Sequence, residues 1–157
     1  MGITMRKILI IILSIIFIPL SAMADDIADV KAEFNKYVND ANNYSTNLPN
    51  RYINNAKIIR VVNKKRGGHQ SLIIPYDRYI KELNGHSVLA KAVNYKNRYV
   101  NIKVHKHGND YKLSATRIPR SDKKGLPCYF VYTKQNGVWK IKEESMTTNV
   151  QAFLSSK

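Results

Sequence analysis

The chain lacks the residues for a disulfide, because Cys128 is its only cysteine among 157 residues. No intramolecular disulfide can form, whatever the redox state of the compartment. Cys128 lies beside aromatic residues, and no cationic neighbour in the sequence would lower the pKa of its thiol. We therefore expect Cys128 to be a small buried hydrophobic residue rather than a nucleophile.

Motifs for phosphate binding and for nucleophilic catalysis are also missing. The chain has no Gly-x-x-x-x-Gly-Lys-Ser/Thr segment, and neither Ser71 nor Cys128 lies in a Gly-x-Ser-x-Gly type of elbow. No Ser-His-Asp or Cys-His arrangement follows from the spacing. The sequence therefore gives no catalytic residues and predicts no cofactor.

A metal site has little support. His105 and His107 are two residues apart on a predicted strand, and strict alternation places them on the face of Tyr99 and Lys103. A nearby lysine would repel a cation, and no acidic residue or cysteine stands at ligand spacing. We predict no metal ligands.

Acidic residues are scarce, with 11 Asp and Glu against 26 Lys and Arg and a net charge of +15. A surplus of this size favours anionic partners. The alternative is a compositional bias that serves only solubility. We expect a protein partner or an anionic component of the bacterial envelope, and leave open a peripheral membrane contact and a homodimer.

The first 24 residues have the pattern of a secretory signal peptide. Arg6 and Lys7 precede an apolar run over residues 8–18, Pro19 follows, and Ala22-Met23-Ala24 is a small-x-small cleavage site. The run is shorter than the ~20 apolar residues that span a bilayer. We predict cleavage after Ala24, a periplasmic or secreted protein with no nucleic-acid partner, and one domain over residues 25–157.

Helical periodicity dominates the first part of that domain. The clearest helix covers residues 25–44, and Pro49 is expected to open a short helical turn that carries Tyr52, Ile53 and Ala56. The apolar stripe of the first helix consists of Ile27, Val30, Phe34, Tyr37, Val38 and Ala41. Strands are predicted over 57–62 and 70–74, and a helix over 76–83 that ends at Asn84-Gly85.

From residue 87 onward the period changes to 2, which indicates strands. The predicted meander comprises residues 87–95, 98–106, 111–118, 129–133 and 138–143, and the tail 147–157 is expected to hold a helical turn. Asn136-Gly137 favours a type I′ turn between the last two strands. Phe130 and Tyr132 then share one face, as do Trp139 and Ile141.

This layout resembles the NTF2-like, or cystatin-like cone, superfamily. The resemblance rests on the end of the first helix, on residues 76–83 and on the closing hairpin Asn136-Gly137-Val138-Trp139-Lys140-Ile141. It implies an α+β fold in which N-terminal helices pack on a strongly curved antiparallel sheet. The superfamily contains enzymes, ligand carriers and interaction modules, so the fold alone leaves the function open.

Enzymes of this superfamily use an Asp base and a Tyr or acidic donor in the cone. The nearest candidates here are Tyr37, Asp40, Tyr44 and Asp77. Asp40 lies off the apolar stripe, so we expect it to be solvated, and no acidic residue falls within a strongly apolar strand face. Catalysis is therefore not the favoured interpretation.

The favoured interpretation is an exported, non-catalytic binding or accessory protein of the envelope with a basic, tyrosine-rich surface. The candidate binding residues are Lys64, Lys65, Arg66, Tyr76, Tyr79, Tyr99, Tyr129 and Tyr132. One alternative is a carrier of an amphiphilic or lipid-like ligand, and another is a small isomerase or dehydratase. A roomy cavity would favour the carrier, and a buried carboxylate that faces a tyrosine would favour the enzyme. A filled core would favour the interaction module.

Overall fold

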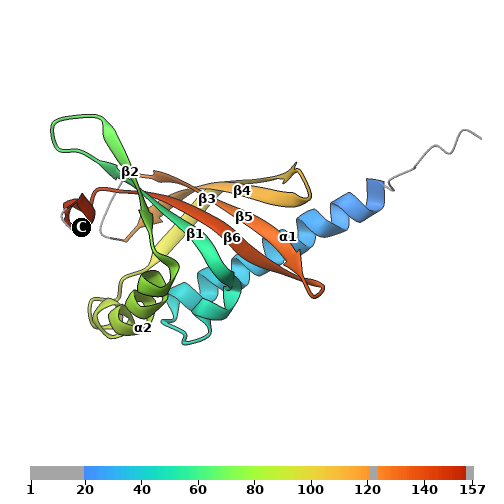
Figure 1. The fold of residues 1–157 in the computed structure, drawn as a ribbon, viewed down its shortest axis with the longest axis horizontal. Coiled ribbons are helices and arrows are strands. Elements are labelled where there is room, and N and C mark those ends of the chain that lie inside the picture. The colour runs from blue at the N-terminus through green and yellow to red at the C-terminus, as the bar shows by residue number, and fades with distance from the viewer. Residues whose placement is uncertain (1–19, 121–123, 155–157) are drawn as a thin grey trace, which may run out of the picture.

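The computed structural model describes residues 20–120 and 124–154. A long helix, α1 (Leu20–Asn42), and a second helix, α2 (Tyr76–Ala92), pack against a single sheet (Figure 1). Val30 and Phe34 of α1, Tyr79 of α2 and Phe130 of the sheet belong to one buried cluster, so both helices cover the same face. The α+β layout is confirmed.

The expected signal peptide lies mostly outside the described residues, which begin at Leu20. Helix α1 runs across the expected cleavage site after Ala24, and Ile27, three residues beyond that site, packs against the core. Within the described part of the chain, no helix is long and apolar enough to cross a membrane.

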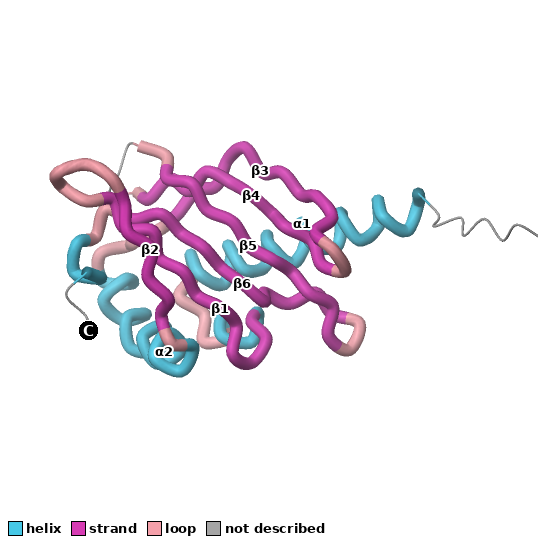
Figure 2. The backbone as a smooth tube through the Cα atoms, turned by 45° about the horizontal axis from the view of Figure 1, so that its top comes forward, coloured by secondary structure: helices cyan, strands magenta, loops and turns pink. Residues whose placement is uncertain are grey.

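The sheet has six strands in the order β2-β1-β6-β5-β4-β3. Their bounds are β1 (Tyr52–Asn63), β2 (His69–Ile74), β3 (Asn97–His107), β4 (Asp110–Pro119), β5 (Leu126–Gln135) and β6 (Val138–Thr148). The sheet is mixed rather than wholly antiparallel, because β1 and β6, which lie side by side (Figure 2), run parallel. The chain leaves β1–β2 through α2, builds the β3–β6 meander, and brings its last strand back beside β1.

Helix α2 continues well beyond the predicted stop at Asn84-Gly85. Glycine inside a helix costs only about 1 kcal/mol relative to alanine, which tertiary packing can override. The real end is at Asn94, which adopts a positive φ of 48°. There the N–H of Tyr95 donates to the carbonyl of Ala90 and that of Asn94 to Lys91, the paired bonds of a Schellman motif. The strand predicted over 87–95 is therefore wrong.

The helical turn at Pro49, in contrast, is shorter than predicted. A 3-10 turn, η1, covers Leu48–Arg51, and Tyr52, Ile53 and Ala56 belong to β1 instead. Tyr52 pairs with Ile141 of β6, so strand pairing overrides the local helical pattern. At the other end of the chain, the expected terminal turn is present as η2 (Gln151–Leu154).

The closing hairpin forms as predicted. Asn136 and Gly137 have φ values of 51° and 79°, as a type I′ turn requires. The four side chains Phe130, Tyr132, Trp139 and Ile141 are all buried on the inner face. Cys128 is also buried, at 6 % exposed, which confirms its expected place in the core.

Two β-bulges change which side chains face inward. In β6, Ile141 pairs with Tyr132 and Glu143 with Val131, so Lys142 is an extra residue and Glu144 turns into the core. In β3, the register shifts between Val100 and Lys103, where Asn101 has a positive φ of 56°.

The bulge in β3 corrects one expectation. Tyr99 and Val104 both pack against the core, although they are five residues apart. Tyr99 therefore does not share a face with His105 and His107, which are exposed. Strict alternation fails here because the extra residue reverses the order of inward and outward side chains.

Candidate ligand-binding cavity

The inner face of the sheet and the two helices enclose two adjoining pockets of about 220 and 540 Å³. The larger volume is within the range of small-molecule sites. Both pockets are lined by Ala41, Tyr44, Leu48, Arg60, Tyr79, Glu82, Leu83, Ala90 and Phe153. These residues come from α1, the loop after it, η1, β1, α2 and η2, so the cavity depends on the whole fold.

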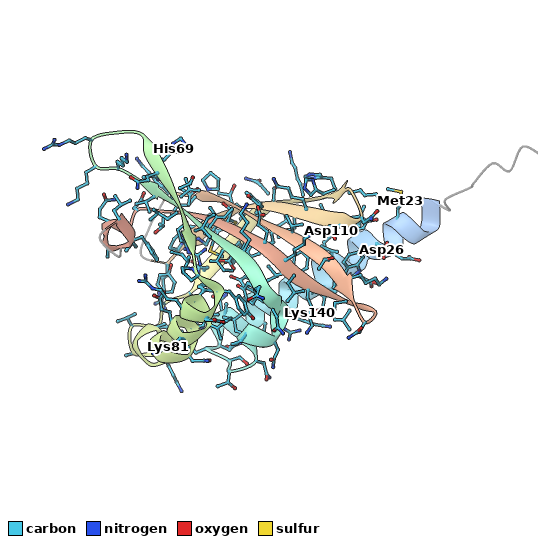
Figure 3. The ribbon with its side chains drawn as sticks, in the orientation of Figure 1. Met23, Asp26, His69, Lys81, Asp110 and Lys140 are labelled. Carbon is cyan, nitrogen blue, oxygen red and sulfur yellow. The ribbon has the colours of Figure 1, made fainter. Side chains whose placement is uncertain are left out.

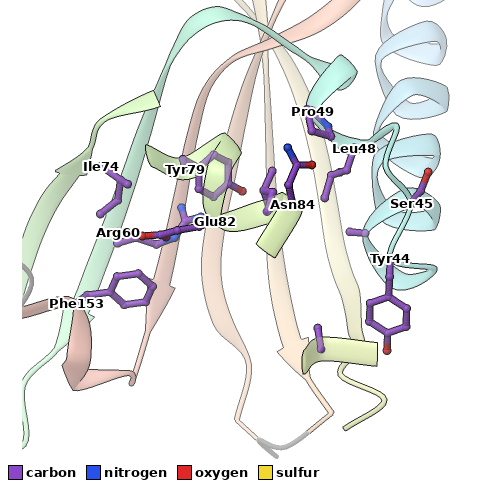
Figure 4. A pocket seen from close by; sticks show the side chains of 13 residues that line it. Tyr44, Ser45, Leu48, Pro49, Arg60, Ile74, Tyr79, Glu82, Asn84 and Phe153 are labelled. Atoms are coloured by element: carbon purple, nitrogen blue, oxygen red, sulfur yellow. The ribbon is translucent and has the colours of Figure 1, made fainter. Parts of the chain in front are cut away.

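Much of the wall is apolar or aromatic. Figure 4 shows Leu48 and Pro49 across the smaller pocket from Ile74, Tyr79 and Phe153. The larger pocket adds Met146 and Val150, with Tyr37, Tyr95 and Tyr99. Such a wall suits the carbon chain or ring of an organic ligand, while the tyrosine hydroxyls supply hydrogen bonds.

A buried polar cluster supports one side of the cavity. Glu144 is 0 % exposed, and Arg60 donates to its Oε1 at 2.8 Å. The hydroxyl of Tyr52 also donates to Glu144, and that of Tyr79 lies 3.3 Å from Oε1. The expectation that no acidic residue falls on an apolar strand face is therefore wrong, because the bulge at Lys142 turns Glu144 inward.

This cluster also affects the tyrosines. Burial, and then the negative charge of Glu144, raises the pKa of Tyr52 and of Tyr79 above the ordinary value. Both hydroxyls thus remain protonated donors at physiological pH. Arg60 lies over the Tyr79 ring, 5.1 Å from its centroid, and both side chains line the pockets. Glu144 is not among the residues that line either pocket.

Arg117 is the second buried arginine of the cavity, at 6 % exposed. Its Nη1 donates to the Tyr95 hydroxyl at 3.0 Å and to Asn97 Oδ1 at 3.1 Å, and its Nη2 donates to the Thr147 carbonyl at 2.8 Å. Its buried Nε has no hydrogen-bond partner among the residues that the structure describes. Among residues 20–120 and 124–154, no carboxylate forms an ion pair with Arg117.

The candidates for acid–base chemistry are separated by the fold. Asp40 is buried rather than solvated, because Arg51 at the end of η1 donates to it at 2.7 Å. Tyr37 and Tyr44 line the larger pocket, and the hydroxyl of Tyr44 donates to the Tyr95 carbonyl at 3.0 Å. Asp77 is exposed in the first turn of α2.

The predicted binding residues do not form one surface. Tyr79 and Tyr99 line the cavity, Tyr76 packs against the neighbouring core, and Tyr132 is buried at 1 % exposed. A buried Tyr132 cannot contact a partner from a surface. Tyr129 donates to Glu143 at 2.6 Å and lies under the Lys112 ammonium, 3.9 Å from the ring centroid.

Lys64, Lys65 and Arg66 occupy the exposed loop between β1 and β2. The loop projects beyond His69, at the far end of the hairpin from α2 and Lys81 (Figure 3). Backbone hydrogen bonds between Lys64 and Gly68 and between Gly67 and Lys64 close it. These cations are separate from the cavity.

Within the described ranges, no group of three or more His, Cys, Asp or Glu residues is placed to hold a metal ion. Two of the cavity residues that the sequence analysis missed could have been placed on the inner face by alternation. Arg60 alternates with Ile58 and Val62, and Arg117 follows Leu113 and Ala115 at the same period of two. No sequence pattern predicts that Glu144 faces inward, because strict alternation from Trp139 places Glu143 inward instead.

No family model and no curated protein matches this chain in sequence. Solved structures match it clearly in fold. An NTF2-like protein with a cystatin-like fold from Novosphingobium aromaticivorans has a TM-score of 0.63 and 8 % identity, over 81 % of this chain and 84 % of that one. The fold of this chain is thus the NTF2-like cone.

Two further neighbours carry enzyme names. A protein from the same organism, provisionally named a scytalone dehydratase, has a TM-score of 0.58 and 10 % identity over 80 % of this chain and 85 % of that one. A Streptomyces avermitilis protein of the NTF2-like family, provisionally named a dehydratase, has a TM-score of 0.60 and 9 % identity, over 82 % and 99 %. At such identities the likeness concerns the fold alone.

Proposed function

We propose that this chain is an exported, non-catalytic binding protein that holds a small amphiphilic ligand in its cone. The observation that carries this proposal is the cavity of about 540 Å³, with its apolar and tyrosine-rich wall. A filled core would have favoured the surface-binding module instead. Export rests on the signal-peptide pattern of residues 1–24.

The arrangement of the acidic residues supports binding rather than catalysis. A general base must reach the substrate directly or through one water. Glu144 lies outside the lining of both pockets, and its oxygens accept hydrogen bonds from Arg60, Tyr52 and Tyr79. Glu82 does line the pockets, but it is paired with Arg78 at 2.8 Å.

A small isomerase or dehydratase is the second candidate. It is favoured by the buried carboxylate beside two tyrosines and by the dehydratase names of two structural neighbours. In that case Glu144 would have to leave Arg60 to act on a ligand. Turnover of a bound ligand by the wild type, and its loss in Glu144→Gln at unchanged ligand affinity, would favour the enzyme.

A substitution that fills the cavity tests the binding function. Ala41 of α1 lines both pockets, whereas Ala32 is exposed on the same helix. Ala41→Phe is expected to weaken binding of a fluorescent anilinonaphthalene sulfonate at least ~10-fold, because the ring occupies ligand space. Titration of Ala32→Phe should match the wild type. Equal affinity of a folded Ala41→Phe protein would contradict the cavity as the binding site.

A further inference from the structure

The charged groups around the cavity are unequally paired. Arg60 has Glu144 at 2.8 Å and Arg78 has Glu82 at 2.8 Å. Arg117 lines the same cavity, and the described part of the chain offers it no carboxylate within ion-pair distance. A buried cation without an anion is unfavourable, and on this side of the cavity no residue that the structure describes neutralises the positive charge.

Arg117 is nevertheless held firmly. Its two terminal nitrogens donate to Tyr95, Asn97 and the Thr147 carbonyl at 2.8–3.1 Å, all of them neutral acceptors. The Nε–H is buried, and the described residues offer it no acceptor. Guanidinium groups bind carboxylates and phosphates, so an anionic head group against the part of Arg117 that lines the larger pocket would supply the missing negative charge.

The apolar wall of the cavity indicates which chemical groups the ligand carries beyond its head group. Arg117 and Asn97 line only the larger pocket, whereas Leu48, Leu83 and Phe153 line both. A ligand with its head at Arg117 can therefore extend a carbon chain along the apolar wall toward the smaller pocket. A small inorganic anion would leave that wall uncovered.

We propose that the larger pocket selects amphiphiles with an anionic head group, and that Arg117 binds this group. This inference rests on the proposed ligand-binding function and adds the chemical class of the ligand. Arg60 does not serve the same purpose, because Glu144 already offsets its charge.

Calorimetric titration of the wild type with decanoate, decanol and decylamine tests the inference without any mutation. The three probes share a chain and differ in the charge of the head group. Decanoate is expected to bind at least ~10-fold more tightly than the other two, as a charge-assisted hydrogen bond implies. Equal affinities would overturn the role of Arg117 and leave the cavity intact. If none of the three binds, the proposed function fails as well.

Arg117→Gln should remove the preference for decanoate over decanol, and Arg117→Lys should retain most of it. Arg98→Gln is the matched control, because Arg98 is exposed on β3 and its loss changes the net charge equally. The near-ultraviolet circular dichroism of each variant reports whether the core is intact. A folded Arg117→Gln protein that still prefers decanoate would contradict the proposal, and so would an equal loss in Arg98→Gln.

Discussion

Glu144 and Arg60 form an ion pair that is almost completely removed from water. Removing one partner of such a pair leaves the other charge buried and unpaired, which typically costs more than the pair contributes. The two tyrosine hydroxyls add hydrogen bonds to the same carboxylate. At the scale of single residues, this cluster is therefore the most sensitive point of the core.

Glu144→Gln is expected to lower the free energy of unfolding by about 3–5 kcal/mol, because Arg60 keeps its charge in the core. Urea unfolding measures this. Glu143→Gln is the control, since Glu143 lies on the outer face and its contact with Lys57 at 3.4 Å is partly exposed. That change should cost less than ~1 kcal/mol. A Glu144→Gln protein as stable as the control would show that the pair is not essential.

Cys128 gives a second prediction at this scale. Burial raises the pKa of its thiol to about 12, and the nearby positive charge of Arg117 offsets only part of that rise. The thiolate is the reactive form, so native Cys128 should react with iodoacetamide at pH 8 far more slowly than the same protein in urea. Equal rates in the two conditions would place Cys128 outside the core.

The elements show where sequence periodicity succeeds and where it fails. Alternation of Phe130 with Tyr132 and of Trp139 with Ile141, together with the turn residues Asn136-Gly137, was enough to predict the closing hairpin. It failed at Glu144, because a one-residue bulge reverses the faces of a strand and leaves no local signal.

The end of helix α2 was predicted wrongly for a different reason. Asn84-Gly85 has the composition of a helix end, yet the cap is built at Asn94, where the backbone has a positive φ and makes the Schellman bonds. Composition alone cannot distinguish these two places, because the choice depends on tertiary packing. The cavity shares this limit: Arg60 and Arg117 could be placed on inner strand faces, but that both line one pocket depends on the strand order.

Gly137 tests the hairpin directly. Its φ of 79° lies in the left-handed region, and, apart from Gly137 and its two neighbours, no atom of the described residues lies within 4 Å of the place where a Cβ would stand. Gly137→Ala should therefore destabilise the fold by about 1–2 kcal/mol through backbone strain alone. Thermal unfolding compares it with Asn136→Gly, which should be nearly neutral. A neutral Gly137→Ala would mean that the turn does not require its positive φ.

At the scale of the whole molecule, the fold is established and the function is proposed. The NTF2-like cone explains why the chain has a cavity, but proteins with this fold serve different functions. The cone of this chain contains one arginine that Glu144 neutralises and another whose hydrogen-bond partners, among the described residues, are neutral. The surplus of cationic residues in the whole chain, 26 Lys and Arg against 11 Asp and Glu, is a separate feature.

Lys64, Lys65 and Arg66 are exposed in the loop between β1 and β2, at the end of this hairpin away from α2 (Figure 1). Replacing all three with Glu should lower the fraction of protein that sediments with vesicles containing anionic lipid at low salt. The difference between the variant and the wild type should shrink as salt screens the charges. Reversing Arg98, Lys103 and Lys106, which are exposed on β3, gives the same change in net charge. Equal losses in both variants would indicate net charge rather than a site.

The most direct test of the central claim is native mass spectrometry of the protein, isolated without detergent from expressing cells. We expect an added mass of a few hundred daltons on the wild type and on Ala32→Phe, and its absence from Ala41→Phe. We also expect decanoate to restore an adduct to a wild-type protein that has been stripped of its ligand. A bare wild-type protein that stays bare when decanoate is added would contradict the claim that the cone holds an amphiphilic ligand.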